Sequence, residues 1–146
     1  MSSLSNDTPS DPGQSPVIVD PGSVYTVIQG TWVKILKNGE EIYNSSNATA
    51  DEIDFLVYLA TGTYTIRTWA KRDTMNGIMD IELDGVVISS KDWYAAAGAY
   101  DIVQDDTGIS VTESKLHTLG LVVNGKHASS TGYLIRVQKI TLQRTA

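Results

Sequence analysis

Short runs of alternating apolar and polar residues follow one another from Val24 to the end of the chain, and turn residues separate them. In residues 64–70 the alternation places Tyr64 and Ile66 on one face of a strand. Trp69 falls on the opposite face. We therefore expect the Tyr64 side to enter the core and the Trp69 side to face outward.

Two-residue turn signals divide these runs into hairpins. Asn38-Gly39 and Asp84-Gly85 each lie between two strand-like runs. The central residues of a type I′ turn need positive φ, which Asn, Asp and Gly tolerate. In the last run the apolar residues slip one step out of phase after Val137, which predicts a β-bulge near Gln138-Lys139.

The pattern as a whole predicts an all-β domain. Apolar residues never recur at a period near 3.6, so helices are at most single turns, whereas about nine short strands fit the sequence, one of them near residues 100–103. A lone sheet of that size would leave one apolar face in water. We therefore expect an antiparallel β-sandwich or jelly roll over residues 24–146.

The first 23 residues have a different composition. All the prolines of the chain lie among them: Pro9, Pro12, Pro16 and Pro21. Proline fixes φ and removes amide donors, which predicts an extended N-terminal arm over residues 1–23 with no core of its own. Such an arm either lies along the surface of another protein, through its prolines, or is a disordered leader, and both alternatives stay open.

Composition excludes several functions. The 146-residue chain carries a net charge of -6, which disfavours nucleic acid as a partner. Without cysteine it can form neither a disulfide nor a thiolate zinc site. No apolar run approaches the roughly 18 residues of a membrane span, and the opening residues lack the features of a signal peptide. We therefore expect no membrane partner and a cytosolic product.

The last 90 or so residues resemble the jelly-roll β-sandwiches of the carbohydrate-binding-module type. The resemblance rests on turn and core positions, namely Gly62, Tyr64, Ile66, Ala70, Ile81, Leu83, Asp84, Gly85, His117, Leu119, Leu121, Val123, Gly125 and residues 130–133. It implies the same fold. Similar domains occur in secreted glycan-degrading enzymes and in virion proteins of tailed bacteriophages, so the resemblance implies fold more specifically than function.

Aromatic residues supply the candidate binding site. Trp69, Trp93, Tyr94 and Tyr100 could offer flat faces to sugar rings, and Trp93-Tyr94 is the best candidate because it lies in an irregular segment. The alternative is that these aromatics plug the open end of the core or form a subunit contact. Trp32, in an alternating strand, is expected in the core.

Acidic and histidine residues give weaker candidates. Asp80, Glu82 and Asp84 alternate on one strand face, where carboxylates could bind calcium or hydrolyse a glycosidic bond. The favoured interpretation is an ordinary solvent face. His117 and His127 have no partner at metal-ligand spacing and are expected at the surface. We therefore expect no cofactor and no enzymatic activity.

These observations favour a structural or accessory protein of a bacteriophage particle, of the capsid decoration or head-fibre type. The arm would bind the major capsid protein or another virion protein, and the sandwich would face outward. The expected location is the virion, assembled in the host cytoplasm. The resemblance implies a homo-oligomer, with a trimer favoured. The alternative is a glycan-binding module or a host-receptor-binding tail tip domain, with a glycan as partner.

Overall fold

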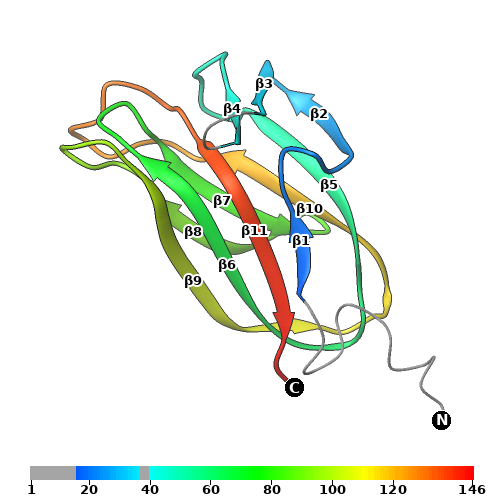
Figure 1. Ribbon diagram of the computed structural model, residues 1–146. Coiled ribbons are helices and arrows are strands. Elements are labelled where there is room, and N and C mark those ends of the chain that lie inside the picture. Colours follow the sequence, from blue (N-terminus) through cyan, green and yellow to red (C-terminus); the bar gives the residue numbers. More distant parts are fainter. Residues whose placement is uncertain (1–15, 37–39) are drawn as a thin grey trace, which may run out of the picture.

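Two antiparallel sheets pack face to face in the computed structural model, which describes residues 16–36 and 40–146 (Figure 1). Sheet A consists of β1 (Val17–Val19), β3 (Trp32–Ile35), β4 (Glu41–Asn44), β6 (Gly62–Arg72), β9 (Ala99–Val111) and β11 (Arg136–Arg144). Sheet B consists of β2 (Tyr25–Gln29), β5 (Glu52–Leu59), β7 (Ile78–Leu83), β8 (Val86–Asp92) and β10 (Lys115–Val123). The predicted all-β sandwich is confirmed, with eleven strands in the described residues rather than about nine.

Strand order places β11 at the centre of sheet A. The order is β3-β4-β11-β6-β9, and β1 also pairs with β11, whereas sheet B runs β2-β5-β10-β7-β8. Figure 1 shows β1, β11, β6 and β9 side by side in one layer, with β5, β10 and β7 in the other. No helix within the described residues could span a membrane.

The core lies between the sheets and is filled by alternate residues. Tyr64 and Ile66 are buried in it, as predicted, and the Tyr64 hydroxyl donates a 2.8 Å hydrogen bond to the Ala60 carbonyl. Trp32 is also a core residue, as expected. Because the core takes every second residue, the residues between them form the outer faces of the sheets.

The N-terminal boundary is a correction. We expected residues 1–23 to lie outside the sandwich, but β1 pairs with β11 through Val17↔Leu142 and Val19↔Ile140. Val19 is 3% exposed, and Pro21 is buried. Pro16 and Pro21 flank the apolar run rather than interrupt it, which an edge strand tolerates. Pro9 and Pro12 lie outside the described residues, so the arm proper is a prediction for residues 1–15.

The structure can be compared with the predicted turns and bulge. β3 and β4 pair as a hairpin, although the Asn38-Gly39 turn lies outside the described residues. Asp84 and Gly85 have φ of 51° and 83°, as a type I′ turn requires. The register of β11 on β6 shifts between Val137 and Lys139, which confirms the predicted bulge.

Strand β9 was only partly predicted. The sequence indicated a short strand near residues 100–103, but β9 extends over 13 residues and pairs with β6 along most of its length. It is an edge strand with few buried side chains, so its apolar periodicity is weak. Backbone pairing with β6, rather than side-chain burial, defines this strand.

Candidate functional site

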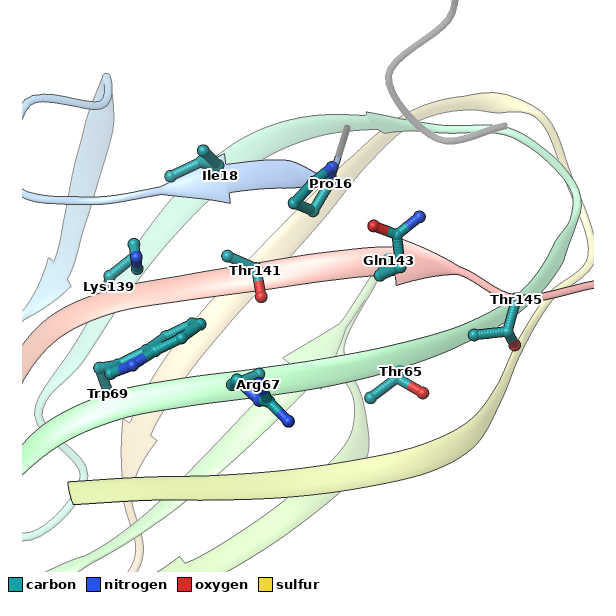
Figure 2. A pocket seen from close by; sticks show the side chains of 9 residues that line it. All are labelled: Pro16, Ile18, Thr65, Arg67, Trp69, Lys139, Thr141, Gln143 and Thr145. Carbon is teal, nitrogen blue, oxygen red and sulfur yellow. The ribbon is translucent and has the colours of Figure 1, made fainter. Parts of the chain in front are cut away.

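A groove of about 480 Å³ runs along the outer face of sheet A. Its lining residues are Pro16, Ile18, Thr65, Arg67, Trp69, Lys139, Thr141, Gln143 and Thr145. Figure 2 shows that they come from three adjacent segments: β6, β11 with the residue after it, and β1 with the residue before it. We call this feature the Trp69 groove. Thr65 and Trp69 lie four residues apart in β6, so the groove is about 13 Å long.

Strand alternation and register place these side chains. On β6 the groove residues alternate with core residues, and on β11 Thr141 and Gln143 do the same. The pairs Lys139↔Trp69, Thr141↔Arg67 and Gln143↔Thr65 then line up across the two strands. Two strands thus form a regular floor, and β1 forms the wall beside β11 (Figure 2).

The bulge in β11 is what brings Lys139 into the groove. Val137 points into the core, so strict alternation would point Lys139 inward as well. The extra residue at Gln138 reverses the facing of everything after it. Lys139 therefore lies outward beside Trp69, and Ile140 is buried.

Two cations flank the Trp69 ring. Lys139 Nζ lies 4.1 Å from the ring centroid and Arg67 Cζ lies 5.7 Å from it. Arg67 also donates two 2.8 Å hydrogen bonds to Asp105. These hydrogen bonds raise the pKa of Arg67 and hold the pKa of Asp105 below its ordinary value. The groove thus combines an aromatic ring, hydroxyl and amide groups, and positive charge.

A second cluster, the Tyr43–Tyr100 cluster, lies on the same outer face. Arg136 donates two 2.8 Å hydrogen bonds to Glu41, whose side chain is 3% exposed. The Arg136 guanidinium lies 5.0 Å from the Tyr43 ring, and Tyr100 donates to Glu41 at 3.4 Å. The hydrogen bonds to Glu41 raise the pKa of Arg136. A partly buried ion pair therefore holds two aromatic rings in place.

The predicted aromatic candidates separate into different regions. Trp69 and Tyr100 lie on the outer face of sheet A, and Tyr100 is 44% exposed. Trp93 is 1% exposed and belongs to the core cluster, which agrees with the alternative that it fills the core and removes it as a ligand or subunit contact. Tyr94 stacks on His127 with centroids 4.5 Å apart and does not line the Trp69 groove.

The three predicted calcium candidates do not meet at one point. Asp80 accepts a 2.9 Å hydrogen bond from Asn124, whereas Asp84 Oδ2 lies 2.6 Å from His117 Nδ1. Asp84 belongs to the turn after β7 and so leaves the face that Glu82 shares with Asp80. Within residues 16–36 and 40–146 no group of three histidine or acidic side chains could hold a metal ion.

His117 is a further correction. We expected it at the surface, but it is 3% exposed. Both ring nitrogens are satisfied, by Asp84 and by the Glu113 carbonyl at 2.8 Å, so burial leaves no polar group unpaired. His127 is exposed, as expected.

Sheet B carries a contrasting feature on its outer face, the Glu52 cluster. The side chains of Glu52, Asp54 and Glu82 surround Gly120, where a Cβ would lie 2.9 Å from Asp54 Oδ1 and 3.4 Å from Glu52 Oε2. Burial raises the pKa of Glu52 to about 7, assisted by its hydrogen bond with Asp54 and by the charges of Asp54 and Glu82. The glycine leaves room for carboxyls that would otherwise be displaced.

Sequence reasoning missed Lys139 and the ion pair of Glu41 with Arg136. A signal for Lys139 was present, because the phase slip in the last strand implies that Lys139 turns outward. The two members of the ion pair lie 95 residues apart in sequence. Only the pairing of β4 with β11 brings them together.

Comparison with solved structures identifies the fold. A xanthan lyase from Paenibacillus aligns with a TM-score of 0.72 and 21% identity over 90% of this chain, which spans 13% of the lyase. A family 36 carbohydrate-binding module in complex with calcium and xylotriose aligns with a TM-score of 0.66 and 16% identity over 86% of this chain and 98% of the module. These likenesses show a jelly-roll β-sandwich of the carbohydrate-binding-module type.

A third similar structure is a family 6 module from Cellvibrio mixtus lichenase 5A in complex with cellotriose. Its TM-score is 0.63, with 13% identity over 89% of this chain and 98% of the module. Comparisons with protein-family models and with curated proteins gave no match. At these identities the fold is shared, and function has to be argued from the site.

Proposed function

We propose that this protein is a non-catalytic glycan-binding module and that the Trp69 groove is its binding surface. The observation that carries the proposal is an indole ring set in an elongated groove whose other walls are rich in hydroxyl and amide groups. A pyranose ring has an apolar face that packs on an aromatic ring, and its hydroxyls need hydrogen-bonding partners. The groove offers both.

The groove has the proportions of a site for a chain rather than for a single small molecule. Hydroxyl groups of Thr65, Thr141 and Thr145 follow the strands away from Trp69 (Figure 2). The floor is made of paired strands, which hold their side chains at fixed spacing. A rigid, open groove of this kind suits a stiff polysaccharide, because little conformational order has to be created on binding.

The lining of the groove also supports a binding role without catalysis. Glycoside hydrolysis requires two carboxyl groups flanking the bond, and general acid-base catalysis requires a titratable side chain within reach. The lining residues include no aspartate, glutamate or histidine. The similar structures support the same role, since two of them were solved with an oligosaccharide and each is covered almost completely by this fold.

The expected role in a bacteriophage particle has no comparable support. The three similar structures described above are a polysaccharide lyase and two carbohydrate-binding modules. The expectation depends on the arm, whose residues 1–15 lie outside the described part of the chain. Capsid binding and trimer formation therefore remain predictions, and the glycan-binding alternative becomes the main hypothesis.

A Trp69→Ala variant tests the proposal. We expect it to reduce affinity for bound polysaccharides at least about tenfold, because the aromatic contact on which the sugar ring stacks is removed from the groove. The measurement is affinity electrophoresis on a panel of neutral and acidic polysaccharides, followed by titration calorimetry.

The matched control is Tyr58→Ala, which removes a 44% exposed aromatic ring from the outer face of sheet B. Equal loss of binding in both variants would place the site elsewhere. Unchanged binding in Trp69→Ala would remove the groove from consideration.

A further inference from the structure

The cations on the outer face of sheet A are not all neutralised. Three are held by carboxylates: Arg67 by Asp105, Lys71 by Asp73 and Arg136 by Glu41. Lys139 makes no ion pair within the part of the chain that the structure describes. Its ammonium group lies over the Trp69 ring instead, at the head of the groove (Figure 2).

The groove is locally positive on an acidic protein. The chain has a net charge of -6, yet the groove lining contains Arg67 and Lys139 and no carboxylate. Asp105 compensates Arg67 from outside the lining, which leaves the charge of Lys139 directed at the groove. A concave surface lined by one sign of charge concentrates ligands of the opposite sign.

The position of Lys139 lets Trp69 distinguish between neutral sugars and sugars that carry a carboxylate. A sugar ring that stacks on the face covered by Lys139 has to displace the ammonium from the indole. For a neutral sugar this displacement loses a cation–π contact, a factor of about two to five in affinity at an exposed site. A sugar with a carboxylate replaces that contact with a charge-assisted hydrogen bond to the same ammonium.

We propose, on the basis of the glycan-binding function above, that the Trp69 groove binds saccharides bearing a carboxylate, namely uronic acid residues of a polysaccharide. Trp69 stacks on the sugar ring, and Lys139 swings from the indole to pair with the carboxylate. Thr141 and Thr65 lie farther along the groove, where they serve the hydroxyls of the neighbouring sugars (Figure 2).

A carboxylate fits this site better than a phosphate. Phosphate sites in proteins typically combine several backbone amides or a bidentate arginine. Here the floor is built from β6 and β11, which pair with each other, and Arg67 already has both hydrogen bonds committed to Asp105. A single ammonium beside hydroxyl groups matches a singly charged anion on a polyhydroxylated ring.

The test compares each acidic polysaccharide with its own neutral derivative. The full chain is titrated with polygalacturonate, alginate and glucuronoxylan, and with the same polymers after chemical reduction of their carboxyl groups to alcohols. We expect at least one acidic polymer to bind about tenfold more tightly than its reduced form. Lys139→Gln should weaken acidic binding about tenfold and leave binding of the reduced form unchanged or tighter.

The matched control is Lys115→Gln, which removes the same charge from an exposed lysine of β10, on the other sheet. Equal affinity for acidic and reduced polymers would overturn the inference. Loss of binding in Trp69→Ala with an unchanged acid preference in Lys139→Gln would leave glycan binding in place and remove the role of Lys139. Absence of binding to every polymer in both forms would overturn the proposed function as well.

Discussion

On sheet A the outer face carries arginine and lysine side chains that lie against aromatic rings, whereas on sheet B the outer face carries the carboxyls of the Glu52 cluster. The same alternation of in and out positions produces both faces. Sheet A compensates its charges with hydrogen-bonded carboxylates, as in the pair of Arg136 with Glu41. Sheet B gathers acidic side chains around Gly120, where burial and the neighbouring carboxyls raise the pKa of Glu52 to about 7.

The difference shows that the two outer faces of one β-sandwich can carry different chemistry around a shared core. Ion pairs on sheet A fix aromatic rings without using the core, so the face stays available for ligands. The Glu52 cluster has unfavourable electrostatics and no aromatic ring within it, which fits poorly with a sugar platform. We therefore expect substitutions on sheet A to act on both stability and binding, and substitutions in the Glu52 cluster to act on the pH dependence of stability.

Glu41→Gln should have the largest effect on stability. It leaves the Arg136 charge without its carboxylate in a place where the Glu41 side chain is 3% exposed. Breaking such a pair from one side costs about 3 kcal/mol in free energy of unfolding. Chemical denaturation of the variant measures this loss.

The double variant Glu41→Met, Arg136→Met supplies the control, because replacing both charges with apolar side chains should recover most of the stability. A loss below about 0.5 kcal/mol in Glu41→Gln would mean that the ion pair contributes no more to the free energy of unfolding than a solvent-exposed pair does.

Glu52→Gln should change how stability depends on pH. Glu52 has a folded pKa of about 7 against an ordinary value of 4.5, so the folded state binds the proton more tightly than the unfolded state. The resulting stability is complete below pH 4.5 and is lost as pH rises through 7. The free energy that this pKa shift implies is reduced by solvent screening. We therefore expect the free energy of unfolding of the variant to be about 1 kcal/mol higher than that of the wild type at pH 8 and equal to it near pH 4.5.

Denaturation curves at pH 4.5, 6 and 8 measure this difference. Glu113→Gln serves as the control, because the Glu113 side chain is 73% exposed. If the wild type and Glu52→Gln show parallel pH profiles, folding does not raise the pKa of Glu52.

The sequence predicted the parts of this comparison that depend on alternation alone. The facing of Tyr64 and Ile66 assigned the core, and that of Trp69 assigned the outer face. The bulge at Gln138 was visible as a slip in phase. Strand β1 was missed because three apolar residues between prolines resemble an arm, and only their pairing with β11 makes them a strand.

The parts that depend on contacts between distant strands could not be predicted. His117 was assigned to the surface because its partner, Asp84, lies 33 residues earlier and meets it only across β7 and β10. Trp93 lies in an irregular segment, where alternation gives no facing, so its burial depends on how the end of the sandwich closes. The pattern within one strand tells which face of the sheet a side chain is on, whereas the pairing of distant strands decides which residues that side chain contacts.

Asp105→Asn should have the smallest effect and distinguishes the two ion pairs of sheet A. The pair of Arg67 with Asp105 has the same 2.8 Å two-bond geometry as the pair of Arg136 with Glu41, but its side chains are 48% and 36% exposed. Because water solvates both groups, we expect no measurable change in unfolding. The variant frees Arg67 for the groove, so affinity for an acidic polysaccharide should rise about threefold.

Calorimetry measures this gain in affinity. The control is Asp92→Asn, because the Asp92 carboxylate accepts a hydrogen bond from the Tyr94 backbone amide and does not pair with Arg67. A drop in affinity would show that Asp105 positions Arg67 for the ligand rather than competing with it.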